Sequence, residues 1–171
     1  MKKVLALDLA TRTGWAVGQI EGEPVYGTHL LPETGSDIGS FLLAFDQWLH
    51  DMLTVHAPTL VVFEAPILAG RTQLATVRKL ACLAGHTEFV CAGRQTRRME
   101  ADLQTVKKFF AGHGRADKAA MIAMARRYGW FPKDDNAADA LGLWSYAVFC
   151  VDRGTGSRRF YLGALGAQAR V

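Results

Sequence analysis

Two short apolar runs that each close on an acidic residue constrain this chain most. The first is VLALD, ending at Asp8, and the second is LVVFE, ending at Glu64. Such runs are typical of strands buried on both faces of a sheet, as central parallel strands are. A carboxylate at the end of a buried strand is costly to bury alone, so each acid needs a partner.

Two further acids open the last predicted helix, in the segment DNAAD. Asp135 and Asp139 are four residues apart and so lie on one helical face. The alanines around them keep the helix slim enough to approach a sheet closely. If the strands ending at Asp8 and Glu64 are parallel neighbours, their carboxyl ends share the edge where open α/β sheets place ligands. We predict that the helix brings Asp135 and Asp139 to that edge.

Four converging carboxylates repel one another, and divalent cations with a preference for oxygen ligands remove that repulsion. Two such ions about 4 Å apart activate a water and stabilise the leaving oxygen in phosphoryl transfer. The acids therefore predict metal-dependent phosphodiester chemistry. Taken singly, Asp8 could be a turn residue, Asp135 a helix cap and Asp139 a surface charge. Glu64 is hardest to explain in this way, because apolar residues surround it.

Hydrophobic periodicity predicts the remaining elements. Strands are expected over residues 4–9, 14–20, 25–31 and 59–63, with a fifth over either 88–91 or 97–101. Helices are expected over residues 38–56, 73–86, 116–128 and 135–151, with a short helix ending at Phe110. The order β-β-β-α-β-α-β-α-α predicts an α/β fold with a five-stranded mixed sheet and helices on both faces.

Composition sets the remaining bounds. A chain of 171 residues with 50% hydrophobic content has room for one domain with a core. The net charge of +4 is compatible with a polyanionic partner, although on charge alone a solvated basic face is the better explanation. The three cysteines lack metal-ligand spacing, and no segment resembles a signal peptide or a membrane span. We therefore expect a cytoplasmic protein without a membrane partner.

Four stretches, taken together, resemble the RuvC branch of the ribonuclease H-like superfamily, the Holliday junction resolvases. The short phage and poxvirus-type members are the most similar. The stretches cover residues 5–15, 61–64, 106–118 and 135–141. The resemblance implies a ribonuclease H-like fold, with a nuclease domain over residues 1–152 and a basic tail over residues 153–171.

The resemblance also implies roles for the acids. Asp8, Glu64 and Asp139 match catalytic metal ligands of the family. The family has an acid or a histidine three residues before the last aspartate, where this sequence has Asn136. Asp135, one residue earlier, is our preferred fourth ligand and catalytic residue on the helical spacing, with Asn136 as the alternative.

Basic residues are assigned in the same way. Lys118 matches a catalytic family lysine close to the scissile phosphate, although an exposed lysine at a helix start is nearly as good an explanation. Lys107 matches a DNA-contacting position, and Arg71 and Arg115 are further candidates for phosphate contacts.

The implied function is a Mg²⁺-dependent endonuclease, with Mn²⁺ as a substitute ion, that resolves four-way and other branched DNA by paired nicks. Its setting would be a bacterial or phage-infected cell. Members of the family act as homodimers, and the helix over residues 73–86 is a candidate dimer face, with core packing as the competing role. Trp15 is a candidate for stacking at the branch point, against the more common role of a core tryptophan.

Two other classes remain open. A non-catalytic ribonuclease H-like protein that binds nucleic acid would lose acids, and Asn136 hints at such a loss. An ATP-binding module of the actin and sugar-kinase type also has a strand-Asp-turn-Gly-strand hairpin, as in residues 4–18. That class needs two lobes, and this chain has the length of one. Forks, flaps and RNA–DNA hybrids are alternative substrates of the same enzyme.

Overall fold

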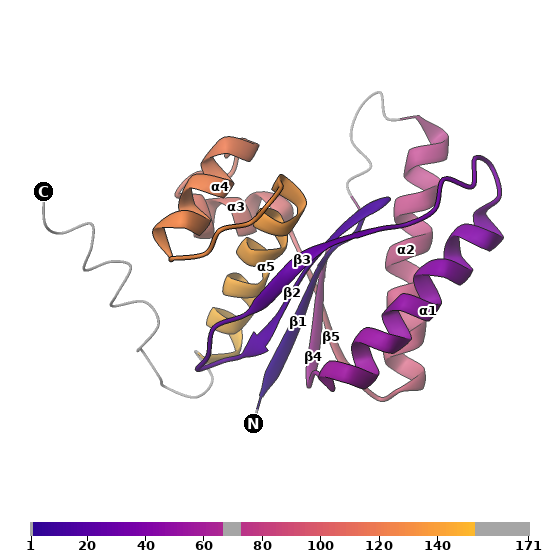
Figure 1. Cartoon of the computed structure of the whole chain (residues 1–171), viewed down its shortest axis with the longest axis horizontal. Coiled ribbons are helices and arrows are strands. Elements are labelled where there is room, and N and C mark those ends of the chain that lie inside the picture. Colours follow the sequence, from indigo (N-terminus) through magenta and orange to yellow (C-terminus); the bar gives the residue numbers. More distant parts are fainter. Residues whose placement is uncertain (1, 67–72, 153–171) are drawn as a thin grey trace, which may run out of the picture.

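The computed structural model describes residues 2–66 and 73–152. Its centre is one five-stranded sheet with the strand order β3-β2-β1-β4-β5 (Figure 1). The strands are β1 (Lys3–Asp8), β2 (Arg12–Gln19), β3 (Val25–Leu30), β4 (Leu60–Glu64) and β5 (Arg97–Ala101). β1 pairs antiparallel with β2 and parallel with β4, so the predicted mixed sheet is confirmed.

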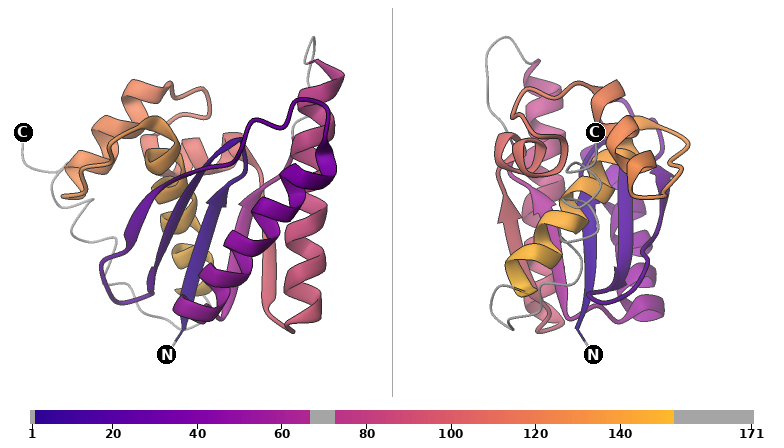
Figure 2. Two further views of the ribbon diagram at one scale, coloured as in Figure 1. Left: turned by 45° about the vertical axis from the view of Figure 1, so that its right-hand side comes forward. Right: turned by 90° about the vertical axis from the view of Figure 1, so that its left-hand side faces the viewer.

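Helices cover both faces of this sheet, as predicted (Figures 1 and 2). They are α1 (Ile38–His56), α2 (Leu74–Gly93), α3 (Leu103–Ala111), α4 (Lys118–Arg127) and α5 (Asp135–Asp152). α1 and α2 lie on one face, and α5 crosses the other face with α3 and α4 packed beside it. The result is a three-layer α/β domain.

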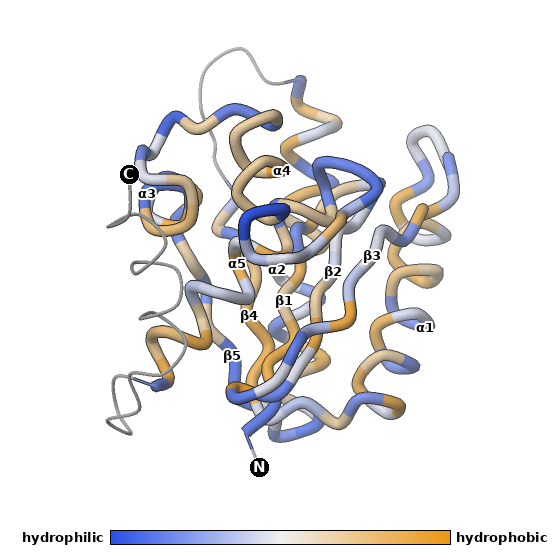
Figure 3. Tube along the Cα trace, turned by 60° about the vertical axis from the view of Figure 1, so that its left-hand side comes forward, coloured by the Kyte–Doolittle hydropathy of each residue, from blue (hydrophilic) through white to orange (hydrophobic). Residues whose placement is uncertain are grey.

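Alternation along the strands divides the core into two halves. In β1, Val4 and Ala6 pack with α3, α4 and α5, whereas Leu5 and Leu7 pack with α1 and α2. β1 and β4 are hydrophobic along their length, while the edge strand β5 is hydrophilic (Figure 3). Charged side chains on an edge strand discourage pairing with another sheet.

Four of the five helices begin in the same way, with an aspartate that caps the first turn. In each case a carboxylate oxygen accepts a hydrogen bond from the backbone N–H three residues later, at distances of 2.8–3.0 Å. The capping residues are Asp37, Asp102, Asp117 and Asp134. Local sequence therefore sets where these helices start.

Two expectations about the elements are corrected. α2 continues to Gly93, so residues 88–91 are helical and the fifth strand is β5. Packing decides this, because Val90 and Cys91 are buried among the α1-side residues as the last turns of α2. The predicted order is also one helix short, because it left out the expected helix ending at Phe110; that helix is α3, so three helices follow β5.

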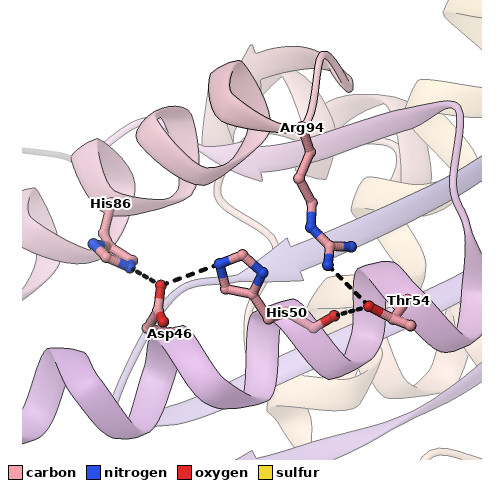
Figure 4. A network of polar contacts seen from close by, with 5 residues as sticks. All are labelled: Asp46, His50, Thr54, His86 and Arg94. Atoms are coloured by element: carbon pink, nitrogen blue, oxygen red, sulfur yellow. Dashed lines mark hydrogen bonds and ion pairs between the residues drawn. The ribbon is translucent and has the colours of Figure 1, made fainter.

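Polar contacts join α1 to α2 at mid-length (Figure 4). Asp46 Oδ1 lies 2.7 Å from His86 Nε2 and 3.5 Å from His50 Nε2. Further along, Arg94 donates to the Thr54 hydroxyl at 3.0 Å, and that hydroxyl donates to the His50 carbonyl at 2.7 Å. These contacts fix the two helices against each other on the face opposite α5.

Within the described residues, no helix has both the length and the apolar character needed to cross a membrane.

Candidate active site

The strand alternation places the first two acids on the same face of the sheet. Ala6 and Val62 both pack against the α5 side of the core. Asp8 and Glu64 lie two residues further along the same two strands and therefore face the same side. Because β1 and β4 are parallel neighbours, their carboxyl ends lie together and the predicted pairing of the two acids is confirmed.

Gly14 allows α5 to pack closely against the sheet beside Asp8. It lies opposite Asp8 in the β1–β2 pair. A Cβ atom at Gly14 would stand 2.0 Å from the Asn136 carbonyl oxygen, so the first turn of α5 rests directly on the β2 backbone. Asp139, one helical turn further on, is thereby held near the carboxyl ends of β1 and β4. Sequence reasoning gave Gly14 no such role, although a glycine inside a strand often marks a close backbone approach.

Asp8, Glu64 and Asp139 lie near enough to one another for their charges to interact. Burial, followed by repulsion from Glu64 and Asp139, raises the pKa of Asp8 well above its ordinary value. Burial and then the Asp139 charge raise the pKa of Glu64 from 4.5 to about 7. Burial also raises the pKa of Asp139. The metal-free site therefore resists full ionisation near neutral pH, and a bound cation would favour the charged carboxylates.

The donor set fits a hard divalent cation. All three side chains offer carboxylate oxygens, which Mg²⁺ prefers. Asp139 Oδ1 is buried and has no hydrogen-bond partner among the described residues, so it is available to a ligand. Within residues 2–66 and 73–152, no three acidic, histidine or cysteine side chains come close enough together to hold one ion. The ligand set therefore stays a prediction.

Asp135 behaves differently from Asp8, Glu64 and Asp139. Its carboxylate pairs with the Lys118 ammonium, and this hydrogen bond lowers the pKa of Asp135. The helix cap is Asp134 instead, so the competing interpretation of Asp135 as a cap is wrong. Asn136 is half-buried where its backbone meets Gly14. The choice of fourth ligand between Asp135 and Asn136 stays open.

Asp134 fastens the start of α5 to the sheet, a role that the sequence did not reveal. Its Oδ1 accepts from the Thr28 hydroxyl of β3 at 2.6 Å and from the Ala137 N–H at 3.0 Å. Its Oδ2 lies 3.6 Å from Arg12 of β2. In sequence, Asp134 and Asp135 are equally good caps, and only the position of Thr28 distinguishes them.

Two substitutions of Asp134 test this fastening. Asp134→Ala is expected to lower the free energy of unfolding by about 1–2 kcal/mol, because the cap and its contact to β3 are both lost. Asp134→Asn keeps the accepting oxygen and loses only an exposed ion pair, so its cost is expected to be below about 0.5 kcal/mol. Urea unfolding measures both. Equal losses would show that the pair with Arg12, and not the cap, holds the helix.

Lys107 faces the acids more directly than the sequence suggested. It is half-buried on α3, and its charge lowers the pKa of Asp8, Glu64 and Asp139 against the effect of burial. Lys118 is more exposed, and the hydrogen bond with Asp135 raises its pKa. Two lysines therefore flank the carboxylates, from α3 and from α4.

The other candidate DNA contacts that the structure describes do not gather around the carboxylates. Arg115 lines a groove between α3 and the loop before α4. Arg71 and residues 153–171 lie outside the described residues. The expectation that Trp15 stands beside the acids is wrong, because its side chain packs with the α1 side of the core. Adjacent residues of a strand face opposite sides, so Gly14 meets α5 and Trp15 faces away from it.

Comparison with known proteins supports the same fold. No protein-family model matches the sequence. Over 116 residues the chain is 34% identical to the crossover junction endodeoxyribonuclease RuvC of Streptomyces coelicolor. That alignment spans 63% of this chain and 58% of the relative, so less than two thirds of the relative's length is matched.

Solved structures match over more of the chain. RuvC of Thermus thermophilus in complex with Holliday junction substrate aligns with a TM-score of 0.75 and 20% identity, over 91% of this chain and 98% of that one. Another T. thermophilus RuvC structure gives 0.69 and 21% identity, over 87% and 95%. The yeast mitochondrial Holliday junction resolvase Ydc2 gives 0.68 and 11%, over 93% and 82%. The chain therefore has the ribonuclease H-like fold of RuvC, and the resemblance to its phage and poxvirus-type members stays a prediction.

Proposed function

We propose that this protein is a metal-dependent, structure-selective endodeoxyribonuclease that resolves Holliday junctions and other branched DNA by paired nicks. One observation carries the proposal: β1, β4 and α5 bring three half-buried carboxylates to one edge of a sheet whose fold is that of RuvC. The sequence similarity to a crossover junction endodeoxyribonuclease supports it further. The protein would act on DNA in the cytoplasm of a bacterial or phage-infected cell.

In this proposal Asp8, Glu64 and Asp139 hold two Mg²⁺ ions, with Asp135 or Asn136 as the fourth ligand. Mn²⁺ is an alternative ion. Such ions lower the pKa of a bound water and stabilise the leaving oxygen. Lys107, beside the carboxylates, and Lys118, beside Asp135, would attract and orient the scissile phosphate, and their charges would oppose the negative charge that develops on it.

A homodimer is part of the proposal, since two sites related by twofold symmetry suit paired nicks. The candidate dimer face on α2 is partly buried in the core and partly exposed in the structure. Leu83 is fully buried in the core, whereas Leu74 is 82% exposed. Core packing thus uses the inner side of α2, and its outer side remains available to a partner.

The two-lobed ATP-binding alternative finds no support. Residues 2–66 and 73–152 form one sheet with its two helical layers, which is one lobe. The fold similarity to RuvC extends over 91% of the chain.

A cleavage assay tests the proposal. Labelled four-way junction, fork, duplex and RNA–DNA hybrid are incubated with Mg²⁺ or with EDTA, beside the variant Asp8→Asn. We expect symmetric nicks on the junction that require Mg²⁺ and fall at least about 100-fold in the variant, because it loses a ligand and a charge. If nothing is cut with Mg²⁺ or Mn²⁺ while the junction is still bound, the protein is the non-catalytic binding alternative.

A second pair of variants decides the fourth ligand. Asp135→Asn is expected to slow junction cleavage by about 10–100-fold, because a neutral amide oxygen binds Mg²⁺ less well than a carboxylate. Asn136→Ala is expected to retain most of the activity. The Mg²⁺ concentration that gives half-maximal cleavage should rise in Asp135→Asn alone. The reverse pattern would assign the ligand to Asn136.

A further inference from the structure

A basic groove lies on α3, the helix that carries Lys107, and of its lining residues only Arg115 has been given a role so far. Its volume is about 480 Å³, and it opens between the first turns of α3 and the loop that leads to α4. The lining residues are Gln104, Thr105, Lys108, His113, Gly114 and Arg115.

The groove has a defined shape because glycines bend its outer wall. Gly112 ends α3 with a positive φ of 88°, which turns the chain back along the helix. Gly114 then packs against the start of α3, where an added Cβ would lie 3.1 Å from the Gln104 carbonyl oxygen. On the other wall, Asp102 holds Thr105 through its N–H and its hydroxyl, both at 2.8 Å. Backbone packing thus fixes one wall, and the Asp102 carboxylate fixes the other.

The basic side chains of the groove form no ion pair with any described residue. Arg12, Arg98 and Lys118 each pair with a carboxylate. By contrast, no ion pair engages Lys108, His113 or Arg115 within the part of the chain that the structure describes. Lysine and arginine in one groove, beside amide donors, are suited to phosphate oxygens.

The groove and the carboxylates share the same two helices. Lys107 and Lys108 are consecutive on α3 and so point about 100° apart around the helix. Lys107 acts on the carboxylates, while Lys108 lines the groove. Arg115 precedes Lys118, the partner of Asp135, by three residues. The groove and the two lysines near the carboxylates are therefore carried by the same two helices, within one turn of each other along the chain.

We infer that this groove binds a backbone phosphate of the DNA strand being cut, at a position next to the scissile phosphate. The inference rests on the proposed nuclease function and extends it. Lys108 and Arg115 supply the charge, and Gln104 and His113 supply further polar contacts. Holding a neighbouring phosphate fixes the register of the strand and so selects which phosphate reaches the carboxylates.

The first test measures binding of labelled junction by fluorescence anisotropy, in the Asp8→Asn background with Mg²⁺. Lys108→Gln and Arg115→Gln are each expected to raise Kd about 5-fold and to reduce the slope of log Kd against log salt by about 1. The control is Lys2→Gln, an exposed lysine at the opposite end of β1, which removes the same charge and should leave Kd and slope unchanged.

The second test locates the contact. Single neutral methylphosphonates are placed along the cut strand. One position beside the scissile phosphate should weaken binding about 5-fold in the parent and have no effect in the double variant Lys108→Gln/Arg115→Gln, because the same contact is then already lost. If each methylphosphonate raises Kd equally in the parent and in the double variant, the groove proposal is wrong while the proposed nuclease function stands. The groove proposal would also be overturned if the double variant lost binding of inorganic phosphate while every methylphosphonate position weakened DNA binding as much as in the parent. A parent that neither binds nor cuts branched DNA would overturn the proposed function as well.

Discussion

Replacing Glu64 with glutamine is expected to remove cleavage while making the metal-free protein more stable at pH 8. Cleavage should fall at least about 100-fold, because the site loses one of its three half-buried carboxylates. Stability should rise by about 2 kcal/mol, because the folded wild-type protein must bury a charge that the variant lacks. Junction cleavage with Mg²⁺ and urea unfolding in EDTA measure the two effects.

The raised pKa of Glu64 explains why Glu64→Gln should increase the free energy of unfolding at pH 8. Burial raises the pKa of Glu64 from 4.5 to about 7 in the folded protein. Between these values the unfolded chain has released the proton and the folded chain still holds it, so wild-type stability falls as the pH rises, by about 1.4 kcal/mol per pH unit at most. Above pH 7 the loss is complete. Glu64→Gln should flatten the curve in this window.

Added Mg²⁺ should reverse the order of stability. A cation that binds the folded site stabilises the wild type by an amount that grows with the logarithm of its concentration divided by Kd, and Glu64→Gln should gain much less. The two melting temperatures should therefore approach or cross as Mg²⁺ is added. A variant that is less stable than the wild type in EDTA at pH 8 would show that Glu64 is held by a partner other than a cation.

Replacing Gly14 with alanine is expected to destabilise the protein by about 3 kcal/mol, a large effect for one methyl group. The added Cβ would stand 2.0 Å from the Asn136 carbonyl oxygen, and the atoms in conflict are backbone atoms that no rotamer change can move. α5 must then lift from β2, and Asp139 moves away from Asp8. Urea unfolding should show the loss, and junction cleavage should fall with it even where the variant remains folded.

A glycine on the opposite layer provides the matched control. Gly85 lies exposed within α2, and an added Cβ there would meet nothing within 4 Å. Gly85→Ala should stabilise the protein by about 0.5–1 kcal/mol, because alanine is the better helix former. The same chemical change thus has opposite signs at the two sites. If Gly14→Ala is as stable and active as the wild type, the close packing of α5 on β2 is wrong.

Much of the fold could be predicted because its signals are local. Apolar runs, aspartate caps and helical periodicity fix the strands and most helix starts within a few residues. The exceptions are the end of α2 and the choice of fifth strand. Residues 88–91 have strand-like composition, yet Val90 packs among α1-side residues as the end of a helix. That outcome depends on long-range packing, which local pattern does not contain.

Some features of the site also follow from local sequence, whereas others depend on long-range packing. The sequence alone determined that Asp8 and Glu64 end buried strands, and that Asp139 lies in the first turns of a helix slim enough to approach them. Alternation and helical period require no knowledge of the rest of the chain. Only the tertiary structure decided that Asp134 and not Asp135 caps that helix, that Gly14 provides its seat, and that Lys107 faces the carboxylates while Lys108 lines the groove. Each of these depends on which backbone lies against which, and packing of the whole domain sets that arrangement.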